Sequence, residues 1–139
     1  MRLWHIKVLD VLPRQQLLAQ WRELNSIYKK QDNHILINFV YDYSKEHLLL
    51  YSNLVIEEIR KRGYKIKTLD NYNNYFKGIV STENILPYNC FKEKMNDIYL
   101  RECLYNLEEK AYAGGITKTE WNKIYNKFKN TFDLWEGDK

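Results

Sequence analysis

The stretch MRLWHIKVLDVLPRQQLLAQWREL, residues 1–24, decides the fold that we expect for this chain. Pro13 suits the first position of a helix, where its missing N–H costs nothing. Apolar residues then recur at spacings of three and four, which predicts one buried helical stripe. Its members are Leu17, Trp21, Leu24 and Tyr28. We therefore expect a first helix from about Pro13 to Lys30, preceded by an apolar arm at residues 1–12.

The opposite side of this helix carries a distinctive polar pattern. Two adjacent lines of side chains run along it, because residues three, four, seven and eleven apart share a helix face. The lines are Gln15, Arg22 and Ser26, and Gln16, Gln20 and Glu23. A carboxylate is thus set among amides beside an arginine, which makes this face the candidate functional surface.

Three further helices are predicted downstream. Ser44 is the expected N-cap of the second, and Gly63 follows two cations at its end. The third is expected from about Lys94 to Ala111. The fourth starts at the capping-box sequence of residues 117–120 and runs to about Trp135.

Two connecting segments lack such a pattern. Residues 35–41 fit either an extended segment or a short helix, and we favour a buried connector. Residues 64–89 predict a long loop of the kind that is functional or ordered by what it packs on. The predicted fold is all-α, a single irregular domain at residues 1–139 with three to four helices and long connecting loops.

Composition limits the class of protein. The 139 residues are 45% hydrophobic and 29% charged, which is typical of a globular domain. No apolar run approaches a membrane span and no signal-peptide pattern is present, so we expect a soluble, cytoplasmic protein. We also expect a monomer. Cys90 and Cys103 lack metal-ligand spacing, so we expect reduced thiols, no metal site and no cofactor.

The net charge is modest but unevenly distributed. The chain carries a formal charge of +4, and residues 1–40 hold six Lys or Arg against three acids. A local basic face can bind phosphates even when the protein as a whole carries little net charge. An excess of cations of this size is also commonly just solvated surface.

Several features of the first stretch resemble one known family. They are an early arginine at Arg2, a helix holding Gln15, Leu17 and Ala19, and Trp21 followed by Arg22-Glu23-Leu24. This pattern resembles the pyrimidine-dimer DNA glycosylases of the phage endonuclease V type. The runs NFVYD at 38–42, EIRKRGYKI at 58–66 and, more weakly, YFKG at 75–78 agree with it. The strings MRLWH, LPRQQLLAQWRE and HILINFVYDYS resemble a bacterial branch more closely still.

The resemblance implies a DNA-repair enzyme whose nucleophile is the N-terminal α-amine. Such an amine has an unperturbed pKa of about 7.7 to 8, roughly 2.5 units below lysine, so an appreciable fraction is neutral at about pH 7. It would attack C1′ of the damaged nucleotide, expel the base and form a Schiff base, and β-elimination would cut the strand. Because a bulky second residue such as Arg2 normally prevents methionine removal, we expect the Met1 amine to be the nucleophile. Glu23 matches the family's essential carboxylate, which shuttles protons and stabilises the imine.

The same resemblance implies contacts with damaged double-stranded DNA. Arg22 matches a phosphate-binding arginine, whose planar fork suits a phosphodiester. Lys110 matches only under a loose alignment, and a solvated lysine is its alternative. The expected DNA-binding residues are Arg2, Arg22, His34, Arg14 and Lys110.

Two positions depart from the family pattern and keep other functions open. Ser26 replaces a second helical arginine, and Gln16 stands where the phage enzyme has a histidine. The alternatives are a non-catalytic DNA-binding relative and a protein-interaction domain whose aromatic C-terminal helix docks a partner. The aromatic residues of that helix invite base stacking, but their helical spacing favours a core role for most of them. They are Trp121, Tyr125, Phe128 and Trp135.

Two histidines have less specific interpretations. His5 lies close to the terminus, where it could tune the amine or simply pack. His47 is expected to be an ordinary first-turn residue of the second helix.

Overall fold

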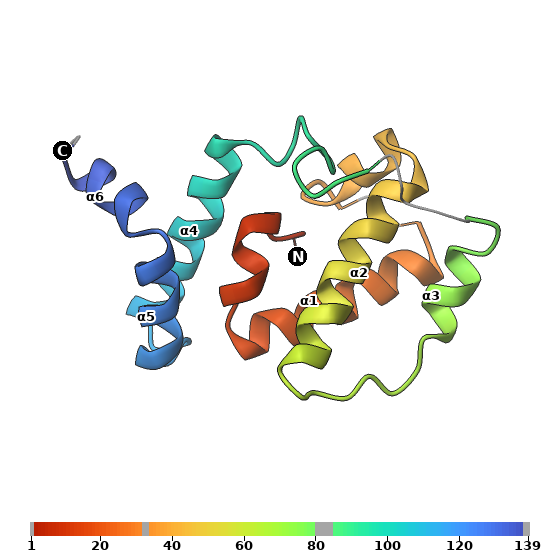
Figure 1. Ribbon diagram of the computed structural model, residues 1–139, viewed down its shortest axis with the longest axis horizontal. Coiled ribbons are helices and arrows are strands. Elements are labelled where there is room, and N and C mark those ends of the chain that lie inside the picture. Colours follow the sequence, from red (N-terminus) through yellow and green to blue (C-terminus); the bar gives the residue numbers. More distant parts are fainter. Residues whose placement is uncertain (1, 32–33, 80–84, 138–139) are drawn as a thin grey trace.

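The computed structural model describes residues 2–31, 34–79 and 85–137, with side chains described as far as residue 133. Its elements in chain order are η1 (Ile6–Val11), α1 (Arg14–Lys29), η2 (Asn38–Asp42), α2 (Lys45–Lys61), α3 (Asp70–Tyr75), α4 (Asp97–Tyr112), α5 (Lys118–Lys127) and α6 (Lys129–Gly137), where η denotes a 3-10 helix. These described ranges contain no strand, so the predicted all-α class is confirmed (Figure 1).

The first two predicted helices are confirmed with small shifts at their ends. α1 begins at Arg14 with Pro13 as its N-cap, one residue later than predicted. α2 has Ser44 at its N-cap. Gly63 ends it with a φ of +84°, a left-handed conformation that glycine adopts without strain. The N–H of Tyr64 then donates to the Ile59 carbonyl, which closes the helix end.

The predicted number of helices is too small, and the two connecting segments contain short helices. Within the described residues there are six α-helices rather than three or four. The predicted loop at 64–89 contains α3, which packs on α1 because Phe76 is buried against Tyr28, with ring centroids 5.4 Å apart. The segment 35–41 leads into η2, so its short-helix alternative is confirmed.

The predicted fourth helix is divided into two. α5 ends at Lys127 and α6 begins at Lys129, with Phe128 between them. Phe128 and Phe132 are buried, and Trp121 packs with its ring centroid 5.6 Å from that of Phe132. The core role expected for most of these aromatics is therefore confirmed, and the side chain of Trp135 lies outside the described residues.

The short helix η1 occupies the middle of the molecule. It contacts α2, α4 and α5, while α1 packs against α2 and α3. In Figure 1 the arm and η1 (red) lie between the α4–α5 pair and the α1–α2 pair, and α3 and α6 lie at opposite ends. One apolar cluster joins buried residues from Leu3 to Phe132, so the N-terminal arm is part of the core.

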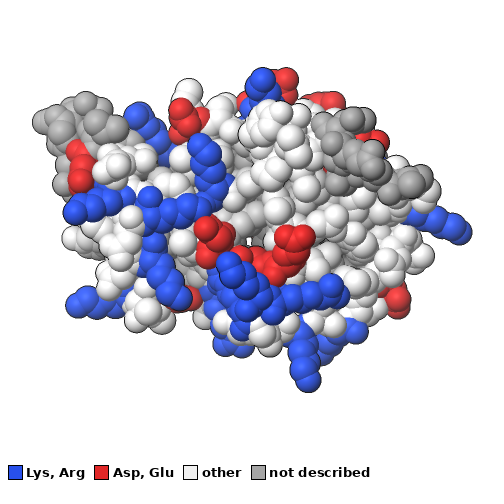
Figure 2. Space-filling view, in the orientation of Figure 1, with Lys and Arg blue, Asp and Glu red and all other residues white. Residues whose placement is uncertain are grey.

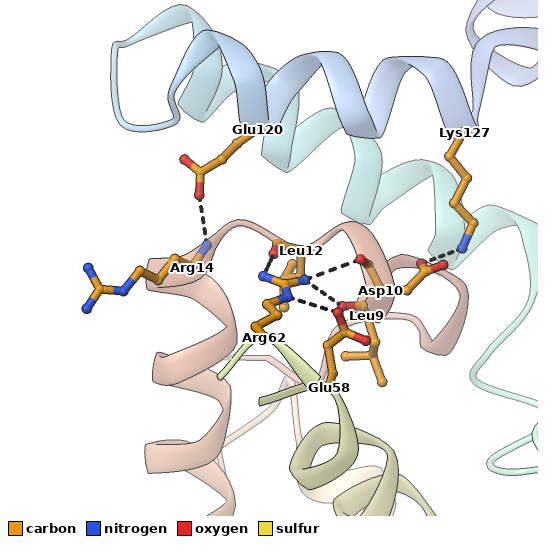
Figure 3. A network of polar contacts seen from close by, with 8 residues as sticks. All are labelled: Leu9, Asp10, Leu12, Arg14, Glu58, Arg62, Glu120 and Lys127. Carbon is orange, nitrogen blue, oxygen red and sulfur yellow. Dashed lines mark hydrogen bonds and ion pairs between the residues drawn. The ribbon is translucent and has the colours of Figure 1, made fainter. Parts of the chain in front are cut away.

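A single guanidinium ties η1 to the C-terminal end of α2 (Figure 3). Arg62 donates to the carbonyl oxygens of Leu12 at 2.6 Å and of Leu9 and Asp10 at 3.3 Å each. Its Nε also pairs with Glu58 at 2.9 Å. The planar fork reaches all these acceptors at once, which a lysine could not do.

Helix α5 is fastened to the same region. The Glu120 carboxylate accepts from the backbone N–H of Arg14 at 2.9 Å, in addition to completing the predicted capping box with Thr117. Lys127 pairs with Asp10 at 2.5 Å (Figure 3). These contacts join α5 to η1 and to the start of α1.

We expect Arg62→Met to lower the free energy of unfolding by about 2–3 kcal/mol, because the three carbonyls lose a charged donor. Urea denaturation measures this loss, and Arg62→Lys should recover only part of it. Arg60→Met, at an exposed position of the same helix, should change stability by less than about 0.5 kcal/mol. Equal losses at positions 60 and 62 would contradict the role given to Arg62.

Candidate active site

The backbone of the N-terminal arm is held by three helices. Three successive arm carbonyls each accept a hydrogen bond from a side chain of a different helix. The pairs are Arg2 O with Gln20 Nε2 of α1 at 3.0 Å, Leu3 O with the Tyr99 hydroxyl of α4, and Trp4 O with the Tyr51 hydroxyl of α2 at 2.6 Å. Because buried carbonyls need partners, these donors fix the path of the arm.

Glu23 lies beside the beginning of this arm. Its Oε2 accepts from Gln20 Nε2 at 3.1 Å, and the backbone of Arg2 lies close to its carboxylate. Burial raises the pKa of the Glu23 carboxyl above its ordinary value, while the Arg2 N–H and the charges of Arg22 and His34 oppose this rise. The carboxylate is thus half-buried, held by donors and able to exchange a proton.

A cavity of about 320 Å³ opens in front of Glu23. The arm, α1 and α4 all contribute to its walls. Its lining residues are Arg2, Trp4, Gln15, Gln16, Ala19, Arg22, Glu23, Asn106 and Lys110. Three cations therefore surround one carboxylate, a combination that suits a phosphodiester bound next to a reacting sugar.

Two residues of the cavity wall carry buried polar atoms without a partner. Within the described structure, the Arg2 Nη1 donor and the Gln16 Oε1 acceptor are both buried and make no hydrogen bond. Arg2 also lies over the Trp4 ring, with its guanidinium carbon 5.6 Å from the centroid. Since nearly all buried polar groups in proteins are paired, a free donor and a free acceptor on one cavity wall favour a ligand site.

The cavity includes most, but not all, of the predicted site residues. Arg2, Arg22, Glu23 and Lys110 line it together. Lys110 is partly exposed to solvent and also lines the cavity.

The other predicted site residues lie elsewhere. Arg14 lines a different cavity, with Tyr64 and Lys123. His34 is exposed, yet its charge acts on Glu23. Met1 lies outside the described residues.

Charge on the surface is mixed. On the face seen in Figure 2, Lys and Arg side chains gather toward the left and lower parts, and Asp and Glu lie among them near the centre. This face therefore does not present one uninterrupted basic patch.

The remaining histidines and the cysteines have structural contacts. His5 is buried, and its Nδ1 accepts from the Lys7 N–H at 3.1 Å, so of its two interpretations the structure supports packing. His47 lies in the first turn of α2, as expected. Its Nδ1 also accepts a hydrogen bond from the Phe91 N–H at 3.0 Å, a contact that the sequence did not predict. Cys90 and Cys103 are free and buried.

Sequence reasoning missed the residues that support the site. Tyr51 fits the apolar stripe of its helix, and nothing in the sequence pattern pairs Tyr99 with the arm or places Asn106 in the cavity wall. Gln20 was placed beside Glu23 by helical spacing, but its contact with Arg2 depends on the folded arm. The available signal was that a tyrosine lies on the apolar face of each helix, because its buried hydroxyl needs a hydrogen-bond partner.

A comparison with family models identifies the class of protein. A family model described as pyrimidine dimer DNA glycosylase matches residues 1–72, just over half of the chain. The chain therefore belongs to the pyrimidine dimer DNA glycosylase family, and the family resemblance seen in the sequence is confirmed. This membership implies glycosylase activity on DNA. Neither the search of curated proteins nor that of solved structures found a match.

Neither a membrane-spanning helix nor a metal-binding cluster occurs in the described part of the chain. No helix there is both long and apolar enough to cross a bilayer. No group of three or more His, Cys, Asp or Glu side chains there is placed to hold a metal ion.

The raised pKa of Glu23 predicts a pH-dependent stability difference. A folded state that raises a carboxyl pKa binds protons more tightly than the unfolded state, so the charged carboxylate costs stability above the unfolded pKa. The stability of Glu23→Gln relative to the unsubstituted protein should therefore improve as pH rises from about 4 to 7. Urea denaturation across this range measures the difference, and a relative stability that falls over the same range would contradict the raised pKa.

Proposed function

We propose that this chain is a DNA glycosylase with abasic-site lyase activity, acting through a Schiff base on its N-terminal amine. The Met1 α-amine is the nucleophile, and Glu23 moves protons and stabilises the cationic imine. The proposal is supported chiefly by the Gln20 amide, which holds the arm beside Glu23. Its Nε2 donates to the Arg2 carbonyl oxygen at 3.0 Å and to Glu23 Oε2 at 3.1 Å.

Chain connectivity limits how far the Met1 amine can lie from the backbone of Arg2. The Met1 nitrogen is three covalent bonds from the Arg2 nitrogen, which means a separation of no more than about 4 Å. Because Gln20 Nε2 binds both the Arg2 carbonyl and Glu23, an amine at the first residue of the mature protein would lie near the same carboxylate. The proposal therefore requires Met1 to begin the mature chain.

The chemistry follows from an amine beside a carboxylate. The amine lone pair forms a bond to C1′ as the bond from C1′ to the base breaks, and the base leaves with that electron pair and takes up a proton. Opening of the sugar ring gives a protonated imine, whose positive charge the Glu23 carboxylate stabilises. Loss of a C2′ proton and departure of the 3′ phosphate then cut the strand, and water releases the amine.

The cationic residues supply the DNA contacts in this proposal. Arg22 is exposed at the cavity and suits a phosphodiester, while Arg2 and Lys110 line the same cavity. His34 and Arg14 would extend the contact along the backbone outside it. We further propose that residues 1–139 act as a single domain and a monomer in the cytoplasm.

Borohydride trapping on an abasic-site duplex tests the proposal. The protein with a C-terminal tag should form a covalent complex, because reduction fixes the imine. The same protein with a block of residues added before Met1 should bind the duplex with similar affinity and form none. Efficient trapping by the extended protein would refute the Met1 assignment. DNA binding without any trapping would instead support a non-catalytic relative.

Glu23→Gln should abolish strand cleavage while leaving the fold intact, because the amide is nearly isosteric but cannot accept a proton. Cleavage falling by about 100-fold or more would fit an essential proton carrier. Circular dichroism checks the fold, and a variant that unfolds would show that Glu23 is structural.

Arg22→Gln should weaken DNA binding similarly for all sequences and reduce the salt slope of log K by about 1, as expected for one lost phosphate contact. A fluorescence titration over several salt concentrations measures the slope. Asn122→Gln, at an exposed position of α5 outside the cavity, provides the control. An unchanged slope in Arg22→Gln would exclude a phosphate contact by Arg22.

A further inference from the structure

We propose that Gln20 is a positioning residue of this reaction, whose side-chain amide holds the N-terminal arm and Glu23 in a fixed relative position. The inference rests on the proposed function, because it assigns a partner to the same amine and carboxylate. It concerns a residue that does not line the cavity proposed to bind DNA. Gln20 is 0% exposed and does not line the cavity.

All of the polar atoms of the Gln20 side chain contact the arm, Glu23 or Tyr51. Oε1 accepts from the Trp4 N–H at 2.8 Å and lies 2.9 Å from the Tyr51 hydroxyl. Nε2 donates to the Arg2 carbonyl at 3.0 Å and to Glu23 Oε2 at 3.1 Å. One buried amide therefore joins two points of the arm, the carboxylate and α2.

Only an amide satisfies these partners together. The Trp4 N–H requires an acceptor, while the Arg2 carbonyl and the Glu23 carboxylate each require a donor, so the amide has one possible orientation. A carboxylate at this position would place a second negative charge against Glu23. An apolar side chain would leave several buried groups without partners.

The position of this contact in the chain means that it should control where the reacting groups lie. Gln20 and Glu23 are three residues apart on α1, one turn of a rigid helix. The arm they hold leads directly to Met1. Because a displacement of about 1 Å in a reacting group can cost about 100-fold in rate, loosening this contact should impair the reaction more than DNA binding.

Gln20→Met tests the inference with the whole chain on an abasic-site duplex. Single-turnover cleavage and borohydride trapping should slow by about 100-fold. The Kd for the duplex should stay within about threefold, because the phosphate-binding side chains are unchanged. Ser52→Ala is the matched control, since it removes a buried hydrogen bond with Tyr28 between the same helices α1 and α2. It should retain cleavage within about threefold, although it too removes a buried contact between α1 and α2.

Gln20→Glu gives a second readout that a merely structural role would not produce. Burial and the neighbouring Glu23 carboxylate favour the protonated form of the new side chain, which can donate one hydrogen bond in place of two. The cleavage rate of this variant relative to the unsubstituted protein should therefore rise as pH falls. The pH dependence of Gln20→Glu therefore tests the role of Gln20 even if Gln20→Met does not fold.

The outcomes separate the two proposals. If the unsubstituted protein forms no trapped complex, the proposed function fails and the role of Gln20 fails with it. If the unsubstituted protein is trapped but folded Gln20→Met cleaves at the same rate, only the role of Gln20 is overturned. A rate ratio for Gln20→Glu that does not change with pH overturns that role as well.

Discussion

The hydrogen bonds of the buried Gln20 amide are the constraint on which the candidate site depends. A polar side chain excluded from water must find partners inside the protein, and those of Gln20 are the arm backbone and Glu23. Tyr51 and Tyr99 satisfy the next two arm carbonyls in the same way. The need to pair buried groups thus holds the Arg2 backbone near the Glu23 carboxylate more firmly than apolar packing alone could.

The site is built by both halves of the chain, although the family match covers residues 1–72 only. α4 lies beyond that match, yet it supplies Tyr99 to the arm and Asn106 and Lys110 to the cavity wall. α5 is fastened to the start of α1 by Glu120. The C-terminal half therefore contributes to the walls of the cavity in front of Glu23 and to the fixing of the arm.

Periodicity and capping signals predicted much of this fold, because α1, α2 and α4 carry clear apolar stripes and α5 begins with a capping box. They missed α3, whose short polar sequence is ordered by Tyr28 and Phe76 through tertiary contacts. The family pattern placed Arg22 and Glu23, which the structure brings together with Arg2 and Lys110 in one cavity. It did not reveal that Arg14, the first residue of α1, lines a different cavity with Tyr64 and Lys123.

The central claim is that the reacting nitrogen is the terminal amine rather than a side chain. The cavity offers a direct competitor, because Lys110 lines it and its amine could also form an imine. Mass spectrometry of peptides from the borohydride-reduced complex distinguishes the two. We predict that the sugar adduct lies on the α-amine of Met1. An adduct on the side chain of Lys110 would contradict the claim.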